Sequence, residues 1–160
     1  MSTVKQSAIR KYLQFKVHEA SKQIADLKKF GAEEAAKQDP EGNQHISPKS
    51  SCWAAYKTAK RDCSLYLTML SIVKQSGDQI PTKAEAVKLF HERQLWNHAR
   101  KGYEAKNFYF KAFRRLQKIG NRLNSSCSPI KGNYGSESAA FQKWELERAA
   151  KLEAKHAAAN

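Results

Sequence analysis

Residues 52–75 read CWAAYKTAKRDCSLYLTMLSIVKQ, and this stretch decides the fold. Its apolar side chains recur at alternating spacings of three and four residues, which is the period of one face of an α-helix. That stripe consists of Tyr56, Ala59, Cys63, Tyr66, Leu70 and Val73. Leu67, Met69 and Ile72 widen the apolar surface beyond the stripe. We therefore predict a helix that is buried over much of its surface and lies at the centre of an all-α fold.

The preceding segment, from Thr3 to about Ala36, shows the same alternation of spacings. Its stripe consists of Leu13, Val17, Ala20, Ile24 and Leu27. Over this length the spacing is typical of a coiled-coil seam. Residues 39–51 contain Pro40, Gly42 and Pro48, which break helices, so we predict a loop between two long helices.

Beyond the central stretch, Thr82 and Glu85 have the spacing of a capping box and predict the start of a further helix. In residues 83–124 Gly102 is the one strong helix breaker, and the apolar face changes direction near residues 96–103. We predict a break or bend at Lys101–Gly102, while one long helix and two shorter ones both remain open.

The chain ends with a Ser- and Gly-rich loop followed by one more helical segment. The predicted fold is an all-α antiparallel helical bundle of four to five helices, some of them long and partly coiled-coil-like. Residues 1–124 form the bundle core, residues 125–136 form the loop, and residues 137–160 form a C-terminal helix. This last helix packs on the bundle or binds a partner.

Composition agrees with one helical domain. The chain has 160 residues, is 41% hydrophobic, and contains only seven Gly and four Pro, which argues against a β-sandwich or barrel. It has no apolar run of the length that a membrane-spanning helix needs. The three cysteines lack CxxC spacing, so neither a disulfide framework nor a zinc site is indicated. We expect a mature protein of the reducing cytoplasm.

Charge is the most unusual property of the chain. There are 29 Lys and Arg against 15 Asp and Glu, a formal net charge of +14. Residues 100–122 alone hold eight basic residues and one acid, so half of the net charge lies in this segment. On a helical wheel, six of the eight basic residues fall on one stripe, opposite an apolar face. These six are Arg100, Lys111, Arg114, Arg115, Lys118 and Arg122.

A row of cations backed by an apolar face suits a phosphate backbone, because each contact releases condensed counterions. Tyr103, Phe108 and Phe110 lie at the edges of the stripe and, if exposed, could stack on unpaired bases. We predict a small nucleic-acid-binding protein that grips the backbone with weak sequence specificity, in a ribonucleoprotein, packaging or regulatory role. No helix-turn-helix, RRM or zinc-finger pattern is present, and the choice between RNA and DNA stays open.

Two other interpretations remain. A basic helix face is often only solvated surface. The protein could also be a helical interaction module, an adaptor, inhibitor or assembly subunit of phage or mobile-element type, that docks its basic face on an acidic partner protein. Phe141 and Trp144 would then be candidate anchors for a partner, although ordinary packing explains them too. Long apolar stripes also permit a homo-oligomer.

The sequence carries no catalytic signature. His91 and His98 share a helical face but lie two turns apart, too far to bind one metal ion, and the HExxH spacing is absent. No serine lies in a GxSxG motif, and no glycine-rich loop has P-loop spacing. We expect no enzymatic activity, no metal and no cofactor.

Overall fold

The fold is all-α, as predicted. The computed structural model describes residues 7–93, 103–131 and 135–159, and there is no strand in these ranges. Five α-helices and one short 3-10 helix make up the fold. They are α1 (Ala8–Gln38), α2 (Trp53–Gln75), α3 (Lys83–Arg93), α4 (Tyr103–Leu123), η1 (Pro129–Lys131) and α5 (Gly135–Ala159).

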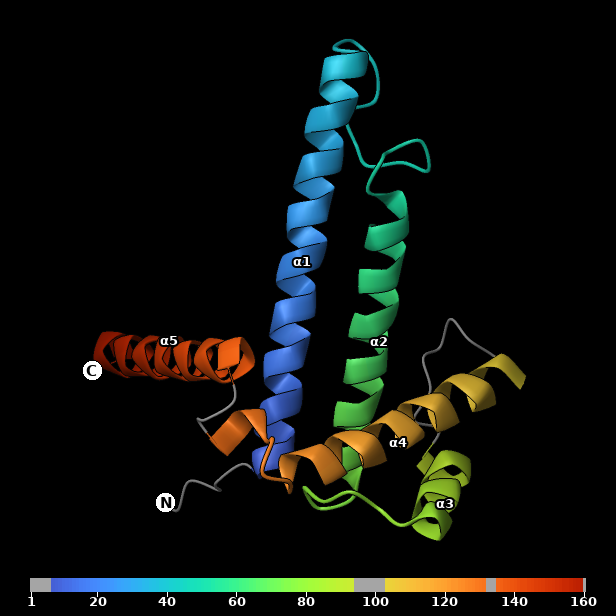
Figure 1. The fold of residues 1–160 in the computed structure, drawn as a ribbon, viewed down its shortest axis with the longest axis vertical. Helices are drawn as coiled ribbons and strands as arrows, with labels where there is room; N and C mark the ends of the chain where they lie inside the picture. Colours follow the sequence, from blue (N-terminus) through green and yellow to red (C-terminus); the bar gives the residue numbers. More distant parts are fainter. Residues whose placement is uncertain (1–6, 94–102, 132–134, 160) are drawn as a thin grey trace.

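Helices α1 and α2 form a long antiparallel hairpin whose distal end projects beyond the other helices (Figure 1). At its base, α1 begins after Ser7, whose hydroxyl accepts a hydrogen bond from the backbone N–H of Arg10 at 3.2 Å. At the distal end, the loop after α1 folds back so that Ile46 occupies the space that a side chain at Gly31 would need. The absence of a side chain at Gly31 therefore lets the loop close on α1.

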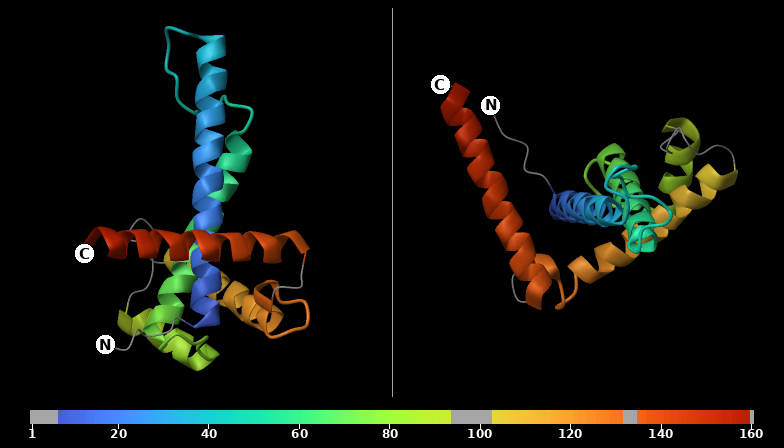
Figure 2. Two further views of the ribbon diagram at one scale, coloured as in Figure 1. Left: turned by 90° about the vertical axis from the view of Figure 1, so that its left-hand side faces the viewer. Right: turned by 90° about the horizontal axis from the view of Figure 1, so that it is seen from above.

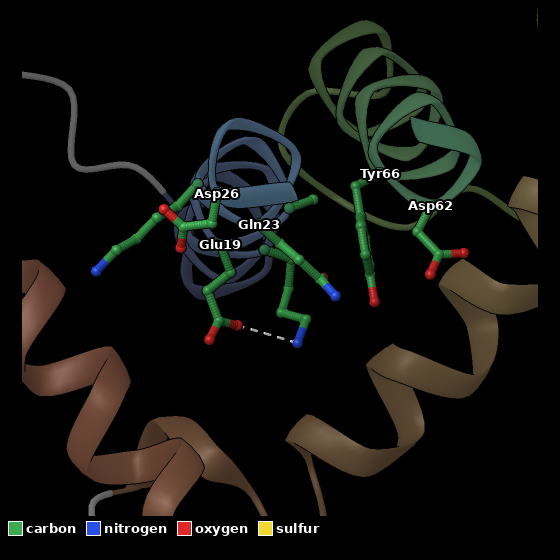
Figure 3. A pocket seen from close by; sticks show the side chains of 8 residues that line it. Glu19, Gln23, Asp26, Asp62 and Tyr66 are labelled. Carbon is green, nitrogen blue, oxygen red and sulfur yellow. Dashed lines mark hydrogen bonds and ion pairs between the residues drawn. The ribbon is translucent and has the colours of Figure 1, made fainter. Parts of the chain in front are cut away.

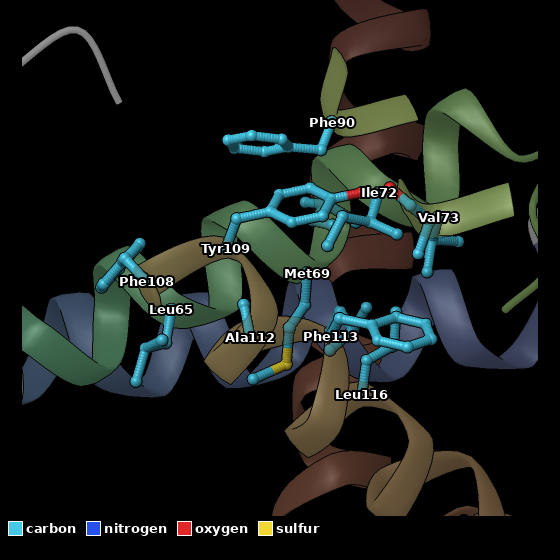
Figure 4. Close-up of a cluster of buried hydrophobic side chains, with 13 residues drawn as sticks. Leu65, Met69, Ile72, Val73, Phe90, Phe108, Tyr109, Ala112, Phe113 and Leu116 are labelled. Carbon is cyan, nitrogen blue, oxygen red and sulfur yellow. Dashed lines mark hydrogen bonds between the residues drawn. The ribbon is translucent and has the colours of Figure 1, made fainter. Parts of the chain in front are cut away.

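The main core lies at the base of the hairpin, where α4 crosses α2 (Figures 1 and 4). Leu65, Met69 and Ile72 of α2 meet Tyr109 and Leu116 of α4, and each of these side chains is at most 1% exposed. These residues include part of the stretch that the sequence placed at the centre of the fold.

Helix α3 covers the outer side of this crossing. The ring of Phe90 lies against that of Tyr109, with centroids 5.1 Å apart (Figure 4). The buried Tyr109 hydroxyl donates a hydrogen bond to the backbone carbonyl of Ala86 at 2.7 Å. At the start of α3, the backbone N–H of Glu85 donates to Thr82 Oγ1 at 3.2 Å, and the Thr82 hydroxyl donates to the Glu85 carboxylate at 3.1 Å. The side chains of Thr82 and Glu85 thus cap this helix, as their spacing predicts.

A second, smaller core joins α5 to the base of α1. It contains Tyr12, Phe15, Leu123 and Phe141, with Trp144 partly buried against it. Seen from above, α4 and α5 diverge from a corner near η1 and enclose the base of the hairpin between them (Figure 2).

The prediction of an antiparallel bundle is confirmed only in part. Helices α1 and α2 are antiparallel, but α4 and α5 cross the hairpin instead of running along it (Figures 1 and 2). One physical reason lies in the distal part of α2, where Lys57 and Lys60 are exposed. A third helix would have to bury these charged side chains to pack along the hairpin. Residues 149–159 of α5 likewise extend away from the core with every described side chain exposed.

The predicted boundaries agree with most of the observed helix ends. Helices α3 and α4 are separate helices with different directions, and the predicted break at Lys101–Gly102 falls outside the described residues. Helix α5 begins at Gly135, inside the predicted 125–136 loop. In the described part of the chain, no helix has both the length and the apolar character to cross a membrane.

Candidate nucleic-acid interface

Helix α4 carries the predicted basic stripe, and its sequence explains its placement. Between Ala105 and Leu123 there is no acidic residue. On the apolar half of the helix, Tyr109, Ala112 and Leu116 are fully buried against α2 and α3, and Ile119 is half-buried. Burial of that half forces the basic half toward solvent. The side chains of Arg114, Arg115 and Lys118 are accordingly exposed, and those of Lys111 and Arg122 are half-buried.

Two predicted interface residues cannot be placed in full. Arg100 lies outside the described residues. Tyr103 is the first residue of α4, and its side chain is not described.

Two arginines of the stripe are paired with acids from other helices. Arg122 Nη2 lies 2.6 Å from Glu137 Oε2 of α5. Arg115 Nη1 lies 3.7 Å from Asp62 Oδ1 of α2, a longer contact between side chains that are both more than 40% exposed. These intramolecular pairs were not predicted, and they reduce the positive charge on one side of α4.

A charged hollow of about 430 Å³ lies on the hairpin between α4 and α5 (Figure 3). Asp62, the partner of Arg115, lines this hollow together with Glu19 and Asp26. Lys16 also lines it and bonds to Glu19 at 3.1 Å. Because acids and bases alternate here, the hollow is charge-compensated within the protein and does not favour an anion.

The remaining cations of the stripe are not compensated in this way. Lys111, Arg114 and Lys118 have no carboxylate within ion-pair distance among the described residues. Arg61 of α2, which is exposed and likewise unpaired in the described part of the chain, lies close enough to act on Lys111. Partial burial together with the positive charges of Arg61 and Arg115 lowers the pKa of Lys111, against the opposite effect of Asp62. We call Arg61, Lys111, Arg114 and Lys118 the cationic face.

Arg61 is the member of the cationic face that sequence reasoning missed. It lies in the central stretch that was interpreted only as core, and nothing in its local sequence relates it to α4. The crossing of α4 over α2 brings it beside Lys111. A helical wheel shows which residues share a face of one helix, and it contains no information about the neighbouring helix.

The two edge aromatics whose side chains are described, Phe108 and Phe110, pack in or against the core. Phe108 is 6% exposed and lies in the main core. Phe110 is half-buried, with its ring centroid 5.8 Å from that of Phe90 and 5.1 Å from that of Tyr109. Because Phe108 is buried in the main core and Phe110 packs against Phe90 and Tyr109, we omit both residues from the candidate interface.

The two candidate partner anchors also serve internal packing. Phe141 is 3% exposed, and its ring meets that of Phe15 edge-on at 5.4 Å. Trp144 packs partly against the same cluster, with the guanidinium of Arg148 5.3 Å from its ring. Both residues dock α5 on α1 within the chain, which is the packing alternative that the sequence left open.

Elsewhere in the described part of the chain the candidate chemical groups are scattered. Among the described residues, no group of three or more His, Cys, Asp or Glu side chains is arranged to hold a metal ion. His91 is exposed beside Phe90, and His98 lies outside the described residues. Cys52, Cys63 and Cys127 are free.

The chain was compared with protein-family models, with curated proteins and with solved structures, and none of the three comparisons found a match. The geometry of the interface is therefore the evidence that bears on its function.

Proposed function

We propose that this protein binds the phosphate backbone of a nucleic acid through the cationic face formed by Arg61 of α2 and by Lys111, Arg114 and Lys118 of α4. The observation that carries the proposal is the lack of internal compensation. Elsewhere on α4, Arg115 and Arg122 have acidic partners, whereas the cationic face gathers like charges from two helices.

A polyanion is the partner that such a face suits best. Phosphate groups along a strand would relieve the mutual repulsion of Arg61 and Lys111, and each contact would release a condensed counterion. The guanidinium groups of Arg61 and Arg114 can hold a phosphate with two parallel hydrogen bonds, which a lysine cannot do.

The rigidity of α4 supports backbone recognition over sequence readout. Its apolar half is fixed in the main core, so the cations on its exposed half are held in a row that can follow a phosphate backbone. Contacts to phosphate position a protein on nucleic acid without specifying sequence. The activity proposed here is weakly sequence-specific binding in the cytoplasm, to RNA or DNA, in a ribonucleoprotein, packaging or regulatory role.

The test compares two triple variants that change the net charge equally. In the first, Arg61, Arg114 and Lys118 of the cationic face are each replaced by Glu. In the second, the matched control, Lys143, Lys151 and Lys155 of α5 are each replaced by Glu. All six side chains are exposed, so both variants should fold, as circular dichroism will verify.

Fluorescence anisotropy with labelled duplex RNA and DNA gives the readout. For the wild type, four phosphate contacts predict a slope of about −3.6 in a plot of log affinity against log salt concentration. We expect the control to keep most of the affinity and the cationic-face variant to lose it. Equal losses in the two variants would mean that only overall charge matters. Absence of binding by the wild type at low salt would reject the proposal in favour of an acidic protein partner.

A further inference from the structure

A notch is formed by residues in the C-terminal half of α4 and by Ile80 in the segment that connects α2 to α3, and its lining includes Arg114 and Lys118 of the cationic face. Its volume is about 590 Å³. It is lined by Ile80, Arg114, Gln117, Lys118, Gly120 and Asn121. We refer to this set as the notch.

The spacing of the α4 residues brings four polar side chains to one side of the helix. Arg114 and Lys118 are four residues apart, and Gln117 and Asn121 are also four apart, so each pair occupies successive turns. All four side chains are exposed. The amides of Gln117 and Asn121 make no hydrogen bond to another residue in the described part of the chain, which leaves both available to a ligand.

The apolar wall of the notch is supplied by Ile80 and depends on Gly120. The Ile80 side chain packs against the main core and occupies the position that a Cβ at residue 120 would take. Any side chain at Gly120 would push Ile80 outward into the notch. The glycine therefore keeps the notch open, and the core contact fixes its wall.

We propose that the notch binds one nucleotide unit of a nucleic-acid strand, an inference that rests on the proposed function. Arg114 and Lys118 hold the phosphodiester. The amides of Gln117 and Asn121 hydrogen-bond to the adjoining sugar or base edge, and Ile80 contacts the sugar.

The donor set favours a nucleotide over a bare phosphate ion. The notch is lined by one guanidinium, one ammonium and two amides, with no carboxylate in its lining. A phosphate ion requires the two cations only, whereas sugar and base edges carry both donors and acceptors that match amides.

The decisive variant removes the amides and leaves charge unchanged. Gln117→Ala with Asn121→Ala is compared with a control in which exposed amides outside the notch are removed, Gln75→Ala with Gln142→Ala. Because the amide variant loses two hydrogen bonds to the ligand, its affinity for duplex RNA or DNA should fall about tenfold or more. The salt slope should stay constant, because no phosphate contact is lost. The control should bind as the wild type does.

A second pair of variants separates the cations of the notch from other cations of α4. Arg114→Gln with Lys118→Gln should make the salt slope shallower by about 1.8, because two phosphate contacts disappear. This variant should also lose binding of a nucleoside monophosphate, measured by NMR shifts of the Gln117 and Asn121 side-chain amides. The matched variant, Lys106→Gln with Lys111→Gln, should retain those shifts on addition of the nucleotide.

The outcomes distinguish failure of the notch from failure of the proposed function. If the amide variant binds nucleic acid as tightly as the wild type, the notch inference is wrong while the cationic face stands. The same conclusion follows if inorganic phosphate shifts the amide signals as strongly as the nucleotide does. If the wild type binds no polynucleotide at all, the proposed function fails, and the notch inference fails with it.

Discussion

Arg122 of α4 and Glu137 of α5 form a close ion pair, with 2.6 Å between Arg122 Nη2 and Glu137 Oε2. The other oxygen of the same carboxylate accepts a hydrogen bond from the Tyr12 hydroxyl of α1 at 2.6 Å. Lys16 Nζ lies 3.9 Å from that oxygen. One carboxylate thus joins three helices at the corner where α4 and α5 diverge.

Replacement of Glu137 by Gln should destabilise the protein by about 1–3 kcal/mol, because two hydrogen bonds that involve a charged group are weakened in a partly buried site. Chemical denaturation monitored by circular dichroism measures this loss. Glu147→Gln is the control, since Glu147 is exposed on the same helix and makes no ion pair with a described residue. A loss of equal size in both variants would contradict the role given to Glu137.

The same carboxylate should make stability depend on acid pH. Burial raises the pKa of Glu137, but the hydrogen bonds from Tyr12 and Arg122 and the charges of Arg122 and Lys16 lower it by more, so the net shift is downward. A carboxyl with a lowered pKa in the folded state stabilises the protein above its unfolded pKa. That contribution is lost as pH falls from about 4.5 through the folded-state pKa.

We therefore expect the difference in unfolding free energy between wild type and Glu137→Gln to shrink as pH falls below about 4.5. Urea titrations at a series of pH values measure this difference. A difference that stays constant into the acid range would show that the carboxylate is not preferentially ionised in the fold.

Tyr109 should make stability fall at alkaline pH. Burial of its hydroxyl, which donates to the carbonyl of Ala86, raises the pKa of Tyr109 from 10.0 to about 12 through desolvation. A raised pKa means that the stabilising contribution is complete below pH 10 and is lost as pH rises toward 12.

Tyr109→Phe should lower the free energy of unfolding by about 1 kcal/mol at neutral pH and make this alkaline decline shallower. Tyr56→Phe, at a tyrosine whose hydroxyl bonds to no other described residue, is the comparison variant. Identical alkaline profiles for all three proteins would refute the assignment.

The elements of the fold could be predicted from the sequence, and their mutual arrangement could not. The apolar repeat of residues 52–75 depends only on helix geometry, so the helix followed directly from it. Its buried face followed only in part, since Leu65 is fully buried outside the predicted stripe and Leu67 is 48% exposed. The same reasoning placed Lys111, Arg114 and Lys118 on one side of a helix. Which helix packs against each face depends on residues that are distant in the sequence. A local repeat does not specify those residues.

The candidate interface shows this limit at individual residues. Arg115 and Arg122 looked equivalent to Arg114 in sequence, yet tertiary packing gave the first two acidic partners in other helices. Arg61 joined the cationic face through the crossing of α2 and α4. The position of Phe110 on the helical wheel was compatible with the interface and with the core. In the structure its ring packs against that of Phe90, at the edge of the core.

The docking of α5 depends on a small aromatic cluster, which predicts local detachment when that cluster is disrupted. Phe141→Ala removes a 3% exposed ring that contacts Phe15, and truncation of a buried Phe costs about 3–5 kcal/mol. The main core of α2, α3 and α4 does not include Phe141. We therefore expect α5 to detach before the remaining helices unfold.

Limited proteolysis should cleave the variant within residues 135–159 and leave a resistant fragment that contains α1 to α4. Leu146→Ala, at a side chain that is 73% exposed, should retain the wild-type cleavage pattern. Simultaneous digestion of all helices in Phe141→Ala would instead show that α5 and the main core unfold as one cooperative unit.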